Sequence, residues 1–181
     1  MNLRRLGIGA VTAALLAAGL WAGIGSARWL STDAEAIGLT ATLGAAKEVP
    51  KPTGVRANAG GTFTAGLVRK GTGGTLSWRI TFRGLTGKAA AAHVHLAKLG
   101  KAGPVAVPLC GPCRSGARGT AKTNARTMTA LLGGGAYVNV HTAKNPAGEI
   151  RGQIRKGGKA PPVGTTTDTT TDTTTTYDPY P

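Results

Sequence analysis

The chain has few aromatic side chains and, outside its two ends, almost no acidic ones. Aromatic residues make up 4% of the 181 residues, whereas there are 29 glycines. A lean aliphatic core with many turns is typical of short strands rather than of long packed helices. Between Ile37 and Ala160 there are 19 lysines and arginines against two glutamates, Glu48 and Glu149, a net charge of +17. This segment is predicted either to attract polyanions, more weakly as salt rises, or simply to stay soluble.

Only one long apolar run is present. Met1–Arg5 is short and positive, and Leu6–Ile24 is an uncharged apolar stretch followed by small residues ending at Ala27. This layout is typical of a secretory signal peptide, which we place over residues 1–27, with a spacer over 28–36. The run is long enough to span a bilayer, so an uncleaved anchor is the alternative. Both interpretations predict a secreted or cell-envelope-associated domain.

A folded domain is predicted over residues 37–157 and a disordered tail over 158–181. The tail is rich in Thr, Asp and Pro and has almost nothing to bury, so it cannot offset the entropy cost of ordering. Thr-rich tracts with Pro are found both as glycosylated stalks and as plain spacers. The sequence leaves these two alternatives open.

Alternation of apolar and polar residues recurs through the domain, and Gly and Pro separate the alternating segments. The clearest example places Leu76, Trp78, Ile80 and Phe82 on one side of a strand. Thr127–Leu132 is predicted to form one short helix. Seven or eight short antiparallel strands at this spacing indicate an all-β sandwich or barrel. The other expected strands cover residues 39–43, 62–68, 92–96, 105–109, 136–141 and 149–155.

All three histidines lie in two of these strand-like segments. His93 and His95 are two residues apart and therefore project from the same face of a strand. His141 lies on a second strand that can pair nearby. Three imidazoles are suited to one Cu or Zn ion with water in an open position. The alternative is a hydrogen-bonded structural seam, because buried polar groups need partners.

Four further polar residues are predicted to belong to this seam: Asn139, Thr142, Glu149 and Arg151. Glu149 and Arg151 share a face of the last strand, where an ion pair would fix the strand register. As a general base, Glu149 would need its pKa raised toward neutrality, whereas a neighbouring Arg lowers the pKa of a carboxyl. We therefore assign Glu149 a structural role and predict no catalytic residue.

Two cysteines, Cys110 and Cys113, flank a Gly-Pro pair. The spacing is that of thioredoxin-like redox motifs, which need a strand-to-helix turn in a βαβ unit. Here the motif follows a strand in a Gly/Arg-rich loop of a domain predicted to be all-β. In an exported protein a local disulfide is the simpler prediction.

A basic segment follows the cysteines and contains Arg114, Arg118, Lys122 and Arg126. Gly116 and Gly119 favour a loop or strand over a helix. The segment is a candidate patch for anionic envelope polymers or lipid surfaces. It lacks the interleaved aromatics that stack on single-stranded nucleic acid, so no nucleic-acid partner is predicted.

The segments AHVHLAKLGKAGPV (residues 92–105), AYVNVHT (136–142) and PAGEIRGQI (146–154), preceded by AKEVP (46–50), resemble the CHRD domain, the module named after chordin. The resemblance implies an immunoglobulin-like, Greek-key β-sandwich of exported bacterial proteins and of chordin. Most members of this family have no known biochemical activity, so the resemblance implies no particular enzymatic reaction. Growth-factor binding belongs to chordin with its additional cysteine-rich modules, which this chain lacks, and is not carried over.

The His-Val-His strand also looks like the copper-ligand strand of copper–zinc superoxide dismutases. This chain has only three histidines and no recognisable zinc-binding loop, so the dismutase activity is not carried over. The sequence therefore predicts an exported, non-enzymatic CHRD-type binding module without a required cofactor. The alternative is a small Cu- or Zn-binding protein or oxidoreductase using His93, His95 and His141.

Overall fold

The computed structural model describes residues 35–161, all of which belong to one compact unit. The predicted signal peptide and all but the first residues of the predicted tail lie outside this range. The described strands are β1 (Ile37–Gly44), β2 (Gly60–Lys70), β3 (Gly73–Arg83), β4 (Ala89–Leu96), β5 (Val105–Cys110), β6 (Arg118–Thr123), β7 (Ala136–Thr142), β8 (Ile150–Gln153) and β9 (Arg155–Lys156). A 3-10 turn, η1 (Ala45–Lys47), and one helix, α1 (Ala125–Gly133), complete the described elements.

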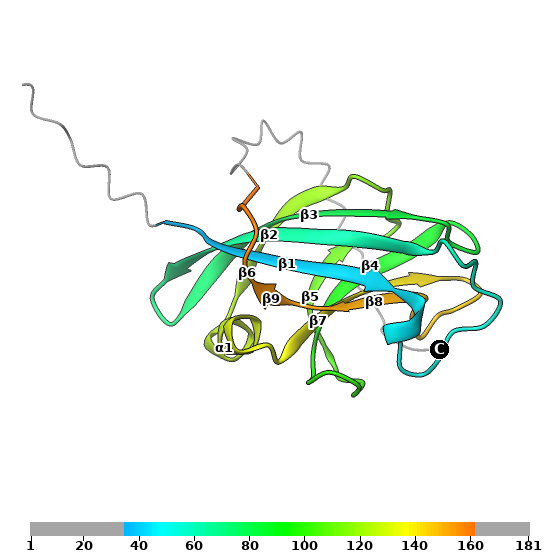
Figure 1. The fold of residues 1–181 in the computed structure, drawn as a ribbon. Helices are drawn as coiled ribbons and strands as arrows, with labels where there is room; N and C mark the ends of the chain where they lie inside the picture. The colour runs from blue at the N-terminus through cyan, green and yellow to red at the C-terminus, as the bar shows by residue number, and fades with distance from the viewer. Residues whose placement is uncertain (1–34, 162–181) are drawn as a thin grey trace, which may run out of the picture. The chain divides into compact units, whose positions relative to one another are not determined.

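The strands form one antiparallel sheet in the order β5-β4-β7-β8-β1-β2-β3-β6, with β9 also pairing with β1 (Figure 1). The prediction of an all-β antiparallel fold is confirmed. The prediction of a two-sheet sandwich is wrong, because β8 pairs with both β7 and β1 and so joins all the strands. The sheet curls until it is nearly closed into a barrel, and residues of its edge strands β5 and β6 approach one another.

The long hairpin of β2 and β3 shows how the alternating sequence builds this sheet. The two strands pair without interruption from Gly60–Arg83 to Lys70–Gly73. Gly71, with a φ of 58°, lies in the turn that joins them, in a conformation that favours glycine. Alternate residues from Phe63 to Leu67 and from Leu76 to Ile80 point inward and are buried. The core so formed includes Leu39, Phe63, Leu67, Leu76, Trp78, Ile80, Val94, Val138, Val140, Ile150 and Ile154.

Helix α1 begins after Asn124, whose side chain accepts a hydrogen bond from the backbone N–H of Thr127. It ends at Gly133, and the C-cap residue Gly134 has the left-handed conformation common at helix C-termini. Met128 and Leu131 are buried against the core. The prediction of one short helix here is confirmed.

One part of the sheet is buried on both faces. On β4, β7 and β8 the inward residues join the apolar core, while the outward residues are polar yet also largely buried. Backbone groups of residues 97–103 and 146–147 bond to these outward side chains, and Glu48 contacts them from the segment after η1. A second, polar layer therefore lies on the outside of this part of the sheet.

Candidate metal centre

The three histidines lie in this outer polar layer. His93 and His95 are on β4 and His141 is on β7, where the register places His93 opposite Asn139 and His95 opposite Tyr137. Their neighbours Val94 and Val140 point the other way, into the apolar core. His93 and His95 are each only 7% exposed, and His141 is partly exposed. The site therefore opens to solvent on its His141 side.

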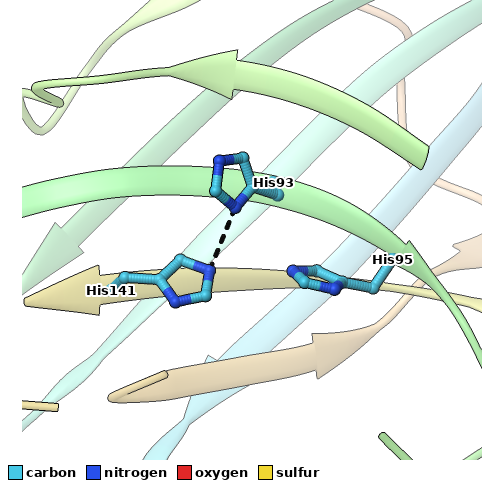
Figure 2. A group of neighbouring side chains, drawn as sticks. All are labelled: His93, His95 and His141. Carbon is cyan, nitrogen blue, oxygen red and sulfur yellow. Dashed lines mark hydrogen bonds between the residues drawn. The ribbon is translucent and has the colours of Figure 1, made fainter. Parts of the chain in front are cut away.

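The three rings converge (Figure 2). Each offers one nitrogen, and these nitrogens all lie within 4.8 Å of one another. His93 Nδ1 and His141 Nε2 are joined by a hydrogen bond of 3.2 Å (Figure 2), and the centroids of their rings are separated by 4.9 Å. The ring centroid of His95 lies 5.7 Å from that of each of the other two. The strand spacing in the sequence predicted this convergence, and the register of β4 and β7 produces it.

Two backbone carbonyls fix the tautomers of His95 and His141. The Nδ1–H of His95 donates to the carbonyl oxygen of Gly103 at 2.9 Å, and that of His141 donates to Pro146 O at 2.8 Å. A neutral imidazole that donates through Nδ1 has its lone pair on Nε2. Within the described part of the chain, the buried His95 Nε2 has no hydrogen-bond partner. The arrangement thus aims two lone pairs at the cluster.

Burial lowers the pKa of all three histidines, because charged imidazolium is poorly solvated there. The pKa of His93 falls to about 4, with burial the largest cause and His141 and His95 adding to it. At neutral pH the cluster is therefore uncharged. Neutral imidazole is the form that binds a metal ion.

The donor set fits a Cu or Zn ion. Metal–nitrogen bonds of about 2.0–2.1 Å place tetrahedral ligand atoms about 3.3 Å apart. The His93–His141 separation of 3.2 Å already matches this value. The widest separation, up to 4.8 Å, requires a small inward movement of one ring. Carbonyls that orient the far side of ligand histidines are a usual second layer of metal sites.

A stack of three side chains supports His95. The ring of Tyr137 stacks on His95 with centroids 4.9 Å apart and planes at 9°, and Arg151 Cζ lies 3.4 Å from the Tyr137 ring centroid. Arg151 is fully buried and donates from Nη2 to Lys98 O at 3.3 Å. Tyr137 was not among the predicted site residues, although it is two residues before Asn139 and so shares its face.

Glu48 is a second residue that the sequence did not assign to the site. It is fully buried, and its Oε1 accepts from Asn139 Nδ2 at 3.3 Å and from the backbone N–H of Val49 at 3.1 Å. Burial raises its pKa to about 7, against the lowering effects of the Val49 bond and the charge of Arg151. Glu48 is one of only two acidic residues between Ile37 and Ala160, and this rarity could have marked it in the sequence as a candidate site residue.

The predicted seam residues Thr142 and Glu149 form a separate buried network. The Glu149 carboxylate accepts from both Thr86 N–H and Thr86 Oγ1 at 2.6 Å, from Thr142 Oγ1 at 2.6 Å, and from Asn145 Nδ2 at 3.2 Å. Burial raises the pKa of Glu149, but these four hydrogen bonds outweigh it and hold the pKa below its usual value. Its partners are thus hydroxyl and amide groups rather than Arg151, which stacks on Tyr137 instead.

The remaining predicted residues lie on other elements. The predicted disulfide between Cys110 and Cys113 is confirmed, and it links the last residue of β5 to the loop that follows. Arg118 and Lys122 lie on the strand β6, Arg114 precedes this strand, and Arg126 is the second residue of α1. All four bases of this segment are exposed. They therefore belong to three successive parts of the chain rather than to one helical face.

The fold and the site define a class of protein. It is a small antiparallel all-β domain that carries an imidazole cluster on the outside of its sheet, beneath covering loops. A family model described as the CHRD domain matches residues 39–154, which is more than half of the chain. The chain belongs to the CHRD domain family. Neither the comparison with curated proteins nor that with solved structures gives a significant match.

Proposed function

We propose that this CHRD domain is an exported metal-binding module that takes one Cu²⁺ or Zn²⁺ ion on His93, His95 and His141. The observation that carries the proposal is the convergence of three neutral imidazoles with their ligand nitrogens within 4.8 Å. A merely structural seam needs each ring nitrogen to find a hydrogen-bond partner. The unpartnered Nε2 of His95, aimed at the other two rings, is better explained as a ligand atom.

The chemistry of the donors favours copper or zinc over Mg²⁺ or Ca²⁺. Imidazole nitrogen suits Zn and Cu, whereas the hard cations Mg²⁺ and Ca²⁺ prefer carboxylate and carbonyl oxygen. A bound ion would offer Lewis acidity and a position open to water or another ligand. The surrounding residues would keep the ligand histidines in place. Gly103 O orients His95, Pro146 O orients His141, and the ring of Tyr137 stacks on His95.

We propose binding rather than catalysis as the role of this centre. The two carboxylates nearest in the fold, Glu48 and Glu149, are both fully buried. Four hydrogen bonds hold the Glu149 carboxylate, and the carboxylate of Glu48 accepts from Asn139 and from the Val49 N–H rather than facing solvent. A proton-transferring base must reach its substrate within hydrogen-bond distance, which this enclosure opposes.

Export is supported by two features. The apolar run of residues 6–24 after a positive start has the layout of a signal peptide. The disulfide between Cys110 and Cys113 is suited to an oxidising compartment. Among residues 35–161, no helix has the length and apolar character needed to cross a membrane.

The test is metal content and affinity of the protein purified without a histidine tag. We expect about one Cu or Zn per chain by elemental analysis, and titration of each ion separately identifies the preferred one. His95→Gln and His141→Gln should each weaken binding by more than about 100-fold, because each removes a ligand. The matched control is Lys98→Ala, an exposed side chain on the covering loop, which should bind like the parent.

Two results would overturn this proposal. One is a folded parent protein that binds neither ion at micromolar concentration. The other is binding that survives all three single histidine-to-glutamine substitutions, which would place the metal elsewhere. Thermal unfolding of each variant without metal establishes that the fold is retained.

A further inference from the structure

The exposed charges of the described residues are almost all positive. Of the 19 lysines and arginines, only Arg151 is buried, and the other 18 are exposed. The described residues contain three carboxylate side chains, and Glu48 and Glu149 are fully buried. Only Glu35 at the edge of the domain remains exposed. The surface therefore offers its cations almost no internal counter-charge.

Three of these arginines and two threonines form one straight row across the sheet, on strands that carry none of the histidines. The strand register aligns Arg155 with Thr40, Thr40 with Thr64, Thr64 with Arg79, and Arg79 with Arg118. Directly paired residues point to the same face. The alternate residues, such as Leu39 and Phe63, belong to the core, so this arginine–threonine row points outward.

Threonines extend the arginine–threonine row along the strands. Thr42, Thr62 and Thr81 are paired in the same way two positions further along β1, β2 and β3. On the other side of the row, residues 36 and 158–160 lie over Gly38 and Gly66, where any side chain would collide with them. The row is therefore bordered by a strip of hydroxyl groups on one side and by a covering segment on the other.

The pair Arg79 and Arg118 is unfavourable without an anion. Their Cβ atoms face each other on adjacent strands, where like charges repel. Two guanidinium groups at this spacing can share one phosphate through paired hydrogen bonds. Threonine hydroxyls beside them can donate to further oxygens. The row thus has the chemistry of an anion-binding surface rather than of a plain solvated face.

The length of the row favours a chain of anions over a single one. Arg79 and Arg155 are three strand spacings apart, about 14 Å, which is too far for one phosphate to bridge. The exposed large hydrophobic residues of the described part are Leu99 and Val105, neither of them aromatic. Without an aromatic stacking platform the surface is poorly suited to bases or neutral sugar rings. It is suited to a polymer recognised through its charges.

We propose that the arginine–threonine row binds a linear phosphodiester polymer of sugars or polyols, laid across β6, β3, β2, β1 and β9. Arg79 and Arg118 hold one phosphate, Arg155 holds a later one, and the threonines between them bond to phosphate and hydroxyl oxygens. This surface is independent of the histidine cluster and uses none of its residues.

The test uses the full chain and synthetic poly(glycerol phosphate), with binding measured across a salt series. Arg79→Gln/Arg118→Gln should weaken binding by at least about tenfold at low salt and reduce its salt dependence, as fewer counterions are released. The matched control, Arg56→Gln/Lys88→Gln, removes the same charge from exposed positions outside the row and should change affinity by less than about threefold.

Three results would overturn the proposal. Equal losses in both double variants would show that only net charge matters. Equal competition by inorganic phosphate at the same phosphate concentration would show that no extended site exists. Tight binding to phosphatidylglycerol vesicles without binding to the polymer would show a membrane surface as the partner.

Discussion

Two regions of one sheet differ in how far their outward side chains are buried. On β4, β7 and β8 the outward side chains are imidazoles, a phenol, two amides and a guanidinium, and they are largely buried. On β1, β2, β3 and β6 the outward side chains are mainly threonines, which are half-buried or exposed, and arginines, which are exposed. The alternation that points residues outward is the same in both regions. The difference arises from the segments near residues 48, 97–103 and 146–148, which cover only the first region.

A polar outward face becomes a site when loop backbone covers it and supplies hydrogen bonds. The carbonyls of Gly103 and Pro146 do so for His95 and His141. The exposed face has no such cover over its arginines, so it can meet only a partner from outside the domain. One region is therefore suited to a small ion and the other to an extended polymer.

The largest effect on stability is expected from a substitution at Gly148, in the covered region. This glycine has a φ of 134°, and a Cβ there would collide with the Asn139 amide and the Glu48 carboxylate. Gly148→Ala should lower the free energy of unfolding by about 3 kcal/mol, through backbone strain and displaced buried polar groups. Urea unfolding measures it. Gly133→Ala, with open space around it, is the control and should cost less than about 1 kcal/mol; equal costs would contradict the prediction.

Next in size is the pH dependence of stability of the metal-free protein. The pKa of His93 is about 4 when folded and 6.5 when unfolded, so its contribution is complete above pH 6.5 and lost as the pH falls toward 4. The pKa of Glu48, raised to about 7, acts with the opposite sign: its contribution is complete below pH 4.5 and lost as the pH rises through 7.

Substitutions separate these two pH effects. Relative to the parent, His93→Gln should remove an acid-side loss of about 3 kcal/mol between pH 7 and 4. Glu48→Gln should remove a loss on raising the pH and so steepen the remaining acid-side decline. Unfolding by urea at several pH values in the presence of a chelator measures both. Parallel curves for the parent and both variants would show that neither group titrates with a shifted pKa.

A smaller effect is expected from a substitution in the covering loop of residues 97–103 that leaves all three ligand histidines unchanged. A Cβ at Gly103 would collide with the carbonyl of Leu96, so Gly103→Ala should displace the carbonyl that orients His95. Metal affinity should fall about tenfold, the usual scale for a residue that orients a ligand. Lys101→Ala on the same loop, which shortens an exposed side chain, should leave affinity unchanged. Titration calorimetry compares them, and equal affinities would remove the orienting role from Gly103.

The smallest effect concerns the exposed region. Arg79→Thr should raise the free energy of unfolding by about 0.5 kcal/mol at low salt, because it relieves repulsion from Arg118. The gain should disappear in 1 M salt, where such charges are screened. Arg69→Thr is the matched control, since Arg69 is opposite Gly74, which carries no side chain. A salt-dependent gain of equal size in both variants would contradict the pairwise explanation.

The sequence predicted the strands well because alternation reports which residues face the core, as in Leu76–Phe82. It could not predict that β8 joins β7 to β1, because alternation is identical in a sandwich and in a closed sheet. The histidines were found because the chain has only three of them. Tyr137 and Glu48 were missed because their roles depend on the cover, which the sequence pattern of the strands does not describe.

The close approach of the two ends of the domain has a mechanical consequence. The methyl groups of Ala36 and Ala160 both lie against Gly66, and β9 pairs with β1 through Thr40 and Arg155 near the same end. A pulling force applied between residues 36 and 160 would separate β9 from β1 by breaking the hydrogen bonds between them one after another. Strands pulled apart in this order separate at low force, and the force does not act across the long β2–β3 hairpin. Under tension the short β9 would therefore detach first and leave the histidine cluster intact.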